Sequence, residues 1–138
     1  MITAQAKFAF DLLQETQKDD NSTIISPTSI SVALGMTLLG AKNNTAKEIA
    51  NAIGKCLNDV EIHKHFSNIL QILQEDSYKN VLKMANKVYF ANDFNLLESF
   101  KKQIQEKYNG NFETVDFHHP HVVNVINEFV ANATNNEI

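Results

Sequence analysis

The sequence contains a single cysteine, Cys56, and no tryptophan. One thiol excludes a disulfide within the chain and a metal site built from several thiolates. Lys and Arg together number 12, are spread thinly, and leave a formal net charge of −4. The sequence therefore contains no basic patch that would indicate binding to nucleic acid or to an anionic membrane surface. The charged fraction of 20% and apolar fraction of 43% are typical of a globular chain, and 138 residues suit one domain or part of one.

The sequence also lacks the patterns of common enzymes. It has no G-x-S-x-G, no phosphate-binding P-loop and no dinucleotide-binding glycine pattern. Cys56 has His63 and His65 nearby in the sequence, but no orienting carboxylate is implied, so an incidental thiol is the better interpretation. The cluster HHPH at residues 118–121 could bind a metal weakly, yet a loop leading into a helix explains it better. We therefore expect no enzyme activity, no metal and no cofactor.

Signals for targeting and modification are few. The first residues, MITAQAKFAFDLLQET, contain neither a basic segment nor a long apolar core, so we expect no signal peptide in them. Residues 21–41 have the length of a membrane span but are too rich in Asn, Ser, Thr and Pro to be one. Glycosylation sequons begin at Asn21, Asn43 and Asn132. They favour an extracellular location slightly over a cytoplasmic one.

The stretch SPTSISVALGMTLLG, residues 26–40, carries no charge at all. Ser26 suits the N-cap of a helix because its hydroxyl can accept a hydrogen bond from a free amide of the first turn. Pro27 suits the first helical position and Gly40 suits the end. A helix that is apolar or small all round is normally buried in the core of a large protein. We therefore expect this helix to be fully buried in the complete protein, and the chain to be only part of its domain.

The remaining patterns predict a chain that mixes helices and strands. Apolar residues at helical spacing predict helices over residues 3–17, 59–75 and 97–108, and a last helix opened by Pro120. Thr45 and Glu48 form a capping box, which predicts a further helix that Gly54 ends. Alternation predicts strands over 80–91 and 111–117, and Asn-Gly at 109–110 predicts the turn before the second strand.

Asn86 is the unusual residue of the first predicted strand. It lies in the middle of the more apolar face, between Met84 and Val88. A buried amide needs hydrogen-bond partners, and leaving one unsatisfied costs roughly 1–3 kcal/mol. We therefore expect Asn86 to be buried with a specific structural role.

Several segments together resemble the serpins. The segments are IISPTSISVALGMTLLGAKNNTAKEI, MANKVYF, NFETVDF and VINEFVANATNNEI, and the resemblance runs in order along essentially all 138 residues. Phe129 stands where many serpins have Trp. Serpins are well over twice this length. The resemblance therefore implies that residues 1–138 are the N-terminal part of a single α+β serpin domain, without the reactive-centre loop and the C-terminal sheets.

The resemblance also implies a function. Serpins inhibit proteases mechanically: the protease cleaves the reactive loop, is acylated, and is trapped when the loop inserts as a new strand in the central sheet. Residues 26–40 would form the helix beneath that sheet. Ser26, Pro27 and Ser29 would lie in the shutter, where the strands part to admit the loop, with Asn86 on a central strand nearby. The plainer interpretation is that these four residues simply cap and pack.

The partners implied are a serine or cysteine protease, engaged through the missing loop, and either the remaining serpin chain or a second copy that completes the sheet. Residues 59–75 carry acidic side chains beside Lys64, which argues against a heparin cofactor. Two alternatives remain open. The protein could be a non-inhibitory serpin, such as a carrier or chaperone, or a truncated serpin-like interaction module.

Overall fold

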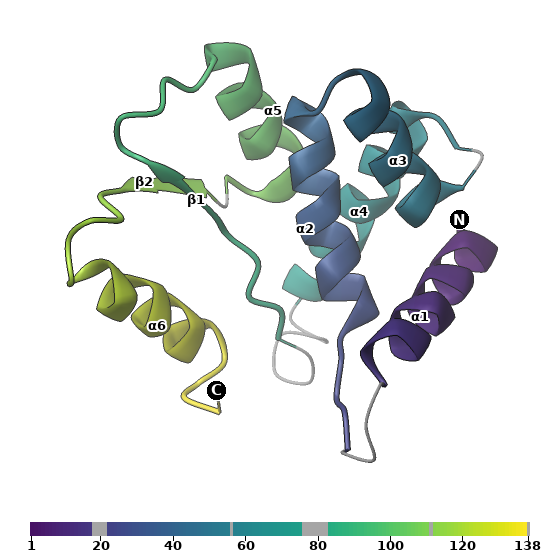
Figure 1. Cartoon of the computed structure of the whole chain (residues 1–138), viewed down its shortest axis with the longest axis horizontal. Coiled ribbons are helices and arrows are strands. Elements are labelled where there is room, and N and C mark those ends of the chain that lie inside the picture. The colour runs from purple at the N-terminus through teal and green to yellow at the C-terminus, as the bar shows by residue number, and fades with distance from the viewer. Residues whose placement is uncertain (18–21, 56, 76–82, 111, 138) are drawn as a thin grey trace. The chain divides into compact units, whose positions relative to one another are not determined.

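The computed structural model describes residues 1–17, 22–55, 57–75, 83–110 and 112–137 (Figure 1). The chain divides into two compact units, residues 1–66 and 67–138, and α4 begins in the first and ends in the second. In chain order the elements are α1 (Ile2–Thr16), α2 (Pro27–Gly40), α3 (Asn43–Gly54), α4 (Asp59–Gln74), β1 (Val88–Ala91), α5 (Glu98–Tyr108), β2 (Phe112–Val115) and α6 (Val122–Ala133).

In the first unit α1, α2 and α3 pack against one another. The Gln5 side chain of α1 donates a hydrogen bond to the carbonyl of Ile53 at 2.6 Å, which ties α1 to the last turn of α3. The fully buried apolar side chains of this unit are Val32, Met36, Ile53, Ile62 and Phe66. Apolar residues of α2, α3 and α4 therefore make the core, and α1 contributes mainly Ala4.

The predicted bounds of the uncharged helix are confirmed. Ser26 is the N-cap of α2, Pro27 is its first residue and Gly40 its last. Val32 and Met36 are buried, whereas Ala33 and Thr37 on a neighbouring face of the helix are exposed in this chain. Complete burial of the helix was expected of the complete protein, and it stays a prediction.

The predicted capping box is wrong. The amide of Ala46 donates to the carbonyl of Lys42 at 3.3 Å, so α3 starts two residues before Thr45 and has no side-chain cap. Asn43 has a φ of 53°, a left-handed conformation that Asn adopts more readily than most residues, and this turns the chain into the helix early. The predicted end of this helix at Gly54 is confirmed.

Reciprocal capping occurs instead at the start of α4. The amide of Glu61 donates to Asn58 Oδ1 at 3.0 Å, and the amide of Asn58 donates to Glu61 Oε2 at 3.1 Å. Two free amides are satisfied, and the carboxylate lies at the positive end of the helix dipole. The predicted helix over 59–75 is confirmed with its bound at Gln74.

The second unit is built around two parallel strands. β1 and β2 pair from Val88 opposite Phe112 to Ala91 opposite Val115, and α5 makes the crossover between them. Both strands are four residues long, which is shorter than predicted. Residues 80–82 and 111 lie outside the described residues. Asn86 precedes β1 rather than lying in a strand.

The remaining predictions for this unit hold. The helix that follows β1 is confirmed as α5, and the Asn-Gly turn is confirmed by positive φ at Asn109 (58°) and Gly110 (69°). The last helix is confirmed as α6, which starts two residues after Pro120. No helix in the described part of the chain is long and apolar enough to cross a membrane.

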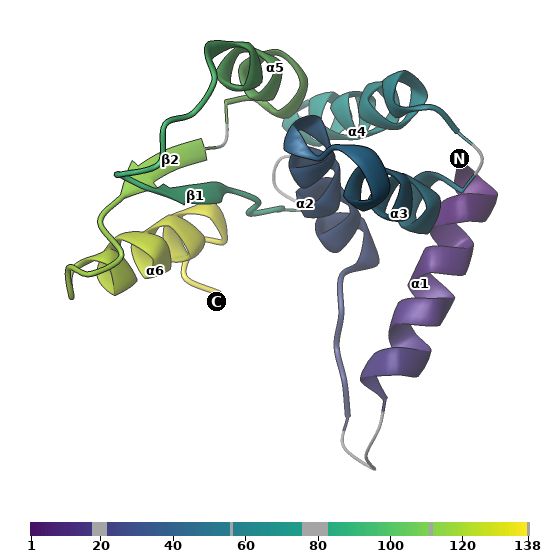
Figure 2. The same ribbon diagram turned by 45° about the horizontal axis from the view of Figure 1, so that its top comes forward.

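β1 presents its two faces to different helices, as Figure 2 shows. Phe90 meets Phe100 of α5 edge to face, with 5.6 Å between ring centroids. Tyr89, on the opposite face, meets Phe129 of α6 at 6.4 Å. Since successive side chains of a strand point to opposite sides, one short strand supports both helices.

The end of α3 requires a glycine because α4 passes close by. A Cβ built on Gly54 would lie 2.6 Å from Cγ1 of Ile62, a distance at which something must shift. Ile62 is fully buried, so its side chain has little room to yield. The absence of a side chain at Gly54 therefore sets how closely α3 approaches α4.

We predict that Gly54→Ala lowers the free energy of unfolding by about 1–3 kcal/mol, the usual cost of overpacking a core. Urea unfolding of the variant and the parent measures this. The matched control is the same change in an Ile62→Ala background, where the obstructing atoms are gone and the added cost should disappear. An equal cost in both backgrounds would contradict the steric explanation.

Candidate functional site

Three of the predicted site residues lie together at the start of α2. The amide of Ser29 donates to Ser26 Oγ at 3.4 Å, and the amide of Ile30 donates to the Ser26 carbonyl at 3.1 Å. Ser26 has extended backbone angles, φ −115° and ψ 90°, as an N-cap requires. Pro27 follows without an amide hydrogen to satisfy. Ser26 is exposed in this chain, whereas Pro27 and Ser29 are half-buried.

Asn86, the fourth predicted residue, belongs to the second unit and is described there. Its exposed fraction is 8%, so the expectation of a buried amide is confirmed. It lies two residues before β1, on the segment that leads into the strand. The structure thus brings Ser26, Pro27 and Ser29 together in the first unit, whereas Asn86 is part of the second.

In the described part of the chain, the other candidate residues do not come together to form a site. Asn43 and Asn132 are exposed, as glycosylation would require, while Asn21 and Cys56 lie outside the described residues. Within the described part of the chain, no three His, Cys, Asp or Glu side chains are placed to hold a metal. The pKa of His65 is lowered, mainly by burial and to a smaller extent by the positive α-amino group of Met1.

Residues of the HHPH cluster take part in local hydrogen bonds that form a turn. The amide of His121 donates to Nδ1 of His119 at 3.2 Å, and the amide of His118 donates to Oδ1 of Asp116 at 2.9 Å. These contacts shape the approach to α6. The interpretation as a loop leading into a helix is therefore the one that the geometry favours.

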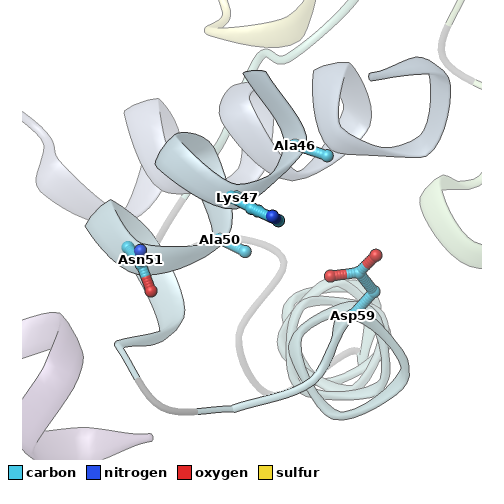
Figure 3. Close-up of a pocket in the computed structure, with 5 residues that line it drawn as sticks. All are labelled: Ala46, Lys47, Ala50, Asn51 and Asp59. Carbon is cyan, nitrogen blue, oxygen red and sulfur yellow. The ribbon is translucent and has the colours of Figure 1, made fainter. Parts of the chain in front are cut away.

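A hollow of about 380 Å³ lies between α3 and the first turn of α4 (Figure 3). Lys47 and Asp59 face it from the two helices, with Asn51 and two alanines completing the wall. Small-molecule sites are usually lined mainly by apolar and aromatic side chains. This lining is polar and small, and its five residues include no nucleophile–base pair.

Two buried hydroxyls were not singled out by the sequence. Ser31 Oγ on α2 and the Tyr89 hydroxyl on β1 have no hydrogen-bond partner among the described residues. A buried hydroxyl without a partner costs roughly 1–3 kcal/mol, and native proteins contain few of them. Such groups indicate polar contacts beyond those described. The alternating pattern around Tyr89 gave its face, but no sequence signal marked the missing partner.

Lys87 is the centre of a polar and aromatic cluster that sequence reasoning also missed. Its Nζ lies 2.6 Å from Glu113 Oε2 of β2, 5.2 Å from the ring centroid of Tyr89 and 4.8 Å from that of Phe129. Lys87 and Tyr89 lie in the segment predicted as a strand, and Phe129 lies in the last predicted helix. Neither pattern indicates that the Lys87 ammonium group contacts both aromatic rings.

The family model for Serpin (serine protease inhibitor) matches residues 3–138. The chain belongs to the serpin family. Human neuroserpin is 36% identical over 92% of this chain and 31% of its own length. Rabbit (Oryctolagus cuniculus) corticosteroid-binding globulin is 31% identical over all of this chain and 38% of its own length. The solved structure of serpin-12 from Manduca sexta matches with a TM-score of 0.84 at 26% identity, covering 98% of this chain and 38% of that one.

The chain spans about a third of the length of the curated relatives it matches, 31% of human neuroserpin for example. The predicted fold, a partial serpin that combines helices with strands of one sheet, is therefore confirmed. The segment SPTS that resembles the serpins forms the start of α2, with Ser26 as the N-cap and Pro27 as the first helical residue. The roles of the individual site residues stay predictions.

We predict that Ser26→Ala lowers the free energy of unfolding by about 1 kcal/mol, because an amide of the first turn of α2 loses its acceptor. Ser26→Asn should stay close to the parent, since Asn caps helices as well as Ser does. Urea unfolding of the parent and of the two variants measures these differences in the free energy of unfolding. Equal losses for Ala and Asn would show that Ser26 does not act as a cap.

Proposed function

We propose that the protein to which residues 1–138 belong is a serine-type endopeptidase inhibitor that acts by reactive-loop insertion. In this proposal the chain is the N-terminal part of a single serpin domain. It supplies part of the scaffold and not the reactive-centre loop that the protease cleaves. The match of the serpin family model over residues 3–138, together with the serpin fold, is the observation that supports it most.

In the proposed inhibition, the proteolytic reaction stops after the protease has been acylated and before the ester is hydrolysed. The serine hydroxyl of the protease attacks the carbonyl of the scissile bond in the reactive loop. The peptide bond breaks, the new amino end departs, and an ester joins protease to inhibitor. Insertion of the loop as a strand then carries the protease away before water can hydrolyse the ester. The loop is not within residues 1–138, so the chain contributes the platform.

The parallel pairing of β1 and β2 supports this role. Parallel sheets are normally covered on both faces and bordered by further strands, and two strands of four residues are too few for a stable sheet. We propose that the further strands come from the rest of the serpin chain. A second copy of this chain is the alternative source, because exposed strand edges promote association.

We further propose that Ser26, Pro27, Ser29 and Asn86 act in the shutter of the central sheet. The cap at Ser26 fixes where α2 begins, and the buried amide of Asn86 lies just before β1. In the complete protein, the loss of one polar group from such a network leaves its partners unsatisfied and so changes how readily the neighbouring strands separate.

A non-inhibitory carrier is the second candidate. The relative named corticosteroid-binding globulin matches all of this chain at 31% identity, so similarity at this level does not separate carriers from inhibitors. A truncated serpin-like interaction module is a further alternative. We propose an extracellular location on the three sequons, and no heparin cofactor on the acidic residues Asp59 and Glu61 at the start of α4.

We predict that the full-length protein forms a detergent-stable covalent complex with at least one serine or cysteine protease, whereas residues 1–138 alone form none. Mixing each protein with a panel of trypsin-like and chymotrypsin-like proteases, followed by denaturing electrophoresis, measures this. The matched control is full-length protein with its reactive loop already cleaved, which should also form none.

Two results would count against the proposal. A complex with residues 1–138 alone would mean that a bait site lies within the scaffold. Full-length protein that stays inert across the panel, yet binds a small apolar ligand stoichiometrically, would favour the carrier.

The shutter has its own test in the full-length protein. We predict that Ser26→Ala and Asn86→Ala increase the rate of heat-induced polymer formation, because each removes one member of the proposed polar network and leaves its partners unsatisfied. Thr28→Ala, a change at an exposed position two residues after Ser26, is the control and should leave the rate unchanged. Parent-like rates in both variants would reduce these residues to ordinary packing.

A further inference from the structure

The turn between α5 and β2 contains Asn109-Gly110, the one Asn-Gly pair in the sequence. Both residues have left-handed backbone angles, with a φ of 58° at Asn109 and 69° at Gly110. Any side chain would be strained at Gly110, and Asn adopts this conformation more readily than most residues do. The geometry of the turn therefore favours a pair of residues that is chemically reactive.

The reactivity of an Asn-Gly pair comes from the backbone amide nitrogen of the glycine. Because Gly110 has no Cβ, this nitrogen is unshielded and can attack Cγ of the Asn109 side chain. A bond forms between the nitrogen and Cγ, the bond from Cγ to Nδ2 breaks, and Nδ2 leaves as ammonia with the proton of the attacking amide. Water then opens the resulting succinimide at either carbonyl and returns a proton to the nitrogen. One opening gives aspartate, and the other gives isoaspartate, in which the main chain runs through Cβ and Cγ.

The folded turn opposes this reaction. At a ψ of 28°, the amide nitrogen of Gly110 and Cβ of Asn109 lie on nearly opposite sides of the Cα–C bond, whereas the ring can close only when they lie on the same side. The carbonyl of Ile104 also accepts a hydrogen bond from the Gly110 amide at 3.2 Å and another from the Asn109 amide. Attack therefore requires rotation about ψ at Asn109 and loss of the Gly110 hydrogen bond.

The residues on both sides of the turn hold it in this conformation. Ile104 and Tyr108 are fully buried, so the last turn of α5 is anchored by its side chains. After the turn, the amide of Phe112, the first residue of β2, donates to the Gly110 carbonyl at 2.8 Å. Asn109 is exposed to water in the folded protein. Backbone geometry, and not exclusion of water, is therefore what protects Asn109.

We propose that Asn109 is a site of spontaneous deamidation whose rate is set by opening of the α5–β2 turn, so that its modification records how often this end of α5 has opened. Both products weaken the turn. Aspartate places a carboxylate at the negative end of the α5 dipole, and isoaspartate lengthens the main chain shortly before the strand pair begins at Phe112. This site does not depend on the proposed inhibitory function.

Peptide mapping by mass spectrometry tests the proposal in the full-length protein. Folded protein and protein unfolded in guanidinium chloride are incubated at the same mildly alkaline pH, which deprotonates more of the backbone amide. Isoaspartate is identified by enzymatic methylation of its carboxyl group. Deamidation at Asn109 should be at least about tenfold slower in the folded sample, since attack waits for local opening. A synthetic peptide of residues 105–115 is the control for the solvent and should react at the same rate in both solutions.

Two variants separate the chemistry from the fold. Asn109→Gly keeps a residue that adopts left-handed angles without strain but has no side-chain amide, so it should fold like the parent and accumulate no product at this position. Asn109→Asp is the aspartate product itself. Its urea unfolding midpoint should be lower than that of the parent, because the new carboxylate lies at the C-terminal end of α5.

Three results would overturn the proposal. Deamidation at Asn109 that is as fast in the folded protein as in the unfolded protein would show that the turn gives no protection. Absence of product at Asn109 in the unfolded protein would show that the pair is not a modification site. A parent-like unfolding midpoint for Asn109→Asp would show that the aspartate product does not weaken the turn.

Discussion

The second unit depends on one constraint, the need of a parallel strand pair for cover on both faces. β1 meets this need with alternate side chains: Phe90 packs toward α5, and Tyr89 packs toward α6 with Lys87 beside it. The contacts on the two faces of β1 differ in chemical character. On the α5 side the described contact is between the rings of Phe90 and Phe100, whereas on the α6 side one cation, one carboxylate and two rings meet. α5 itself buries Ile104 and Tyr108, and burial raises the pKa of Tyr108.

Local patterns predicted the helices well because their signals are local. The cap at Ser26, the proline after it and the glycine at the end of α2 each act within one turn of helix, and all three were read correctly. The capping box at Thr45 failed because a second local option, the left-handed Asn43, started α3 earlier. The same reciprocal geometry formed at Asn58 and Glu61, where Asn rather than Ser or Thr is the cap.

The strands and the site were harder to predict because their partners are distant in sequence. Alternation marked the faces of β1 correctly, but its length depends on what β2 offers, and Asn86 fell outside the ladder. The Lys87 cluster joins residues from β1, β2 and α6, and no periodicity connects them. Partners for Ser31 Oγ and the Tyr89 hydroxyl likewise could not be inferred from neighbouring residues, because a hydroxyl gives no directional signal in sequence.

The parallel register of β1 and β2 has a consequence for how the chain folds. Val88 can meet Phe112 only after all of α5 and its flanking turns have been brought round, so the first strand contact carries the loop-closure entropy of that whole crossover. Helices such as α2 and α5 form from near neighbours and can precede it. During synthesis and refolding the β1 segment therefore spends time without its partner, and this interval is when one chain is most exposed to pairing with another.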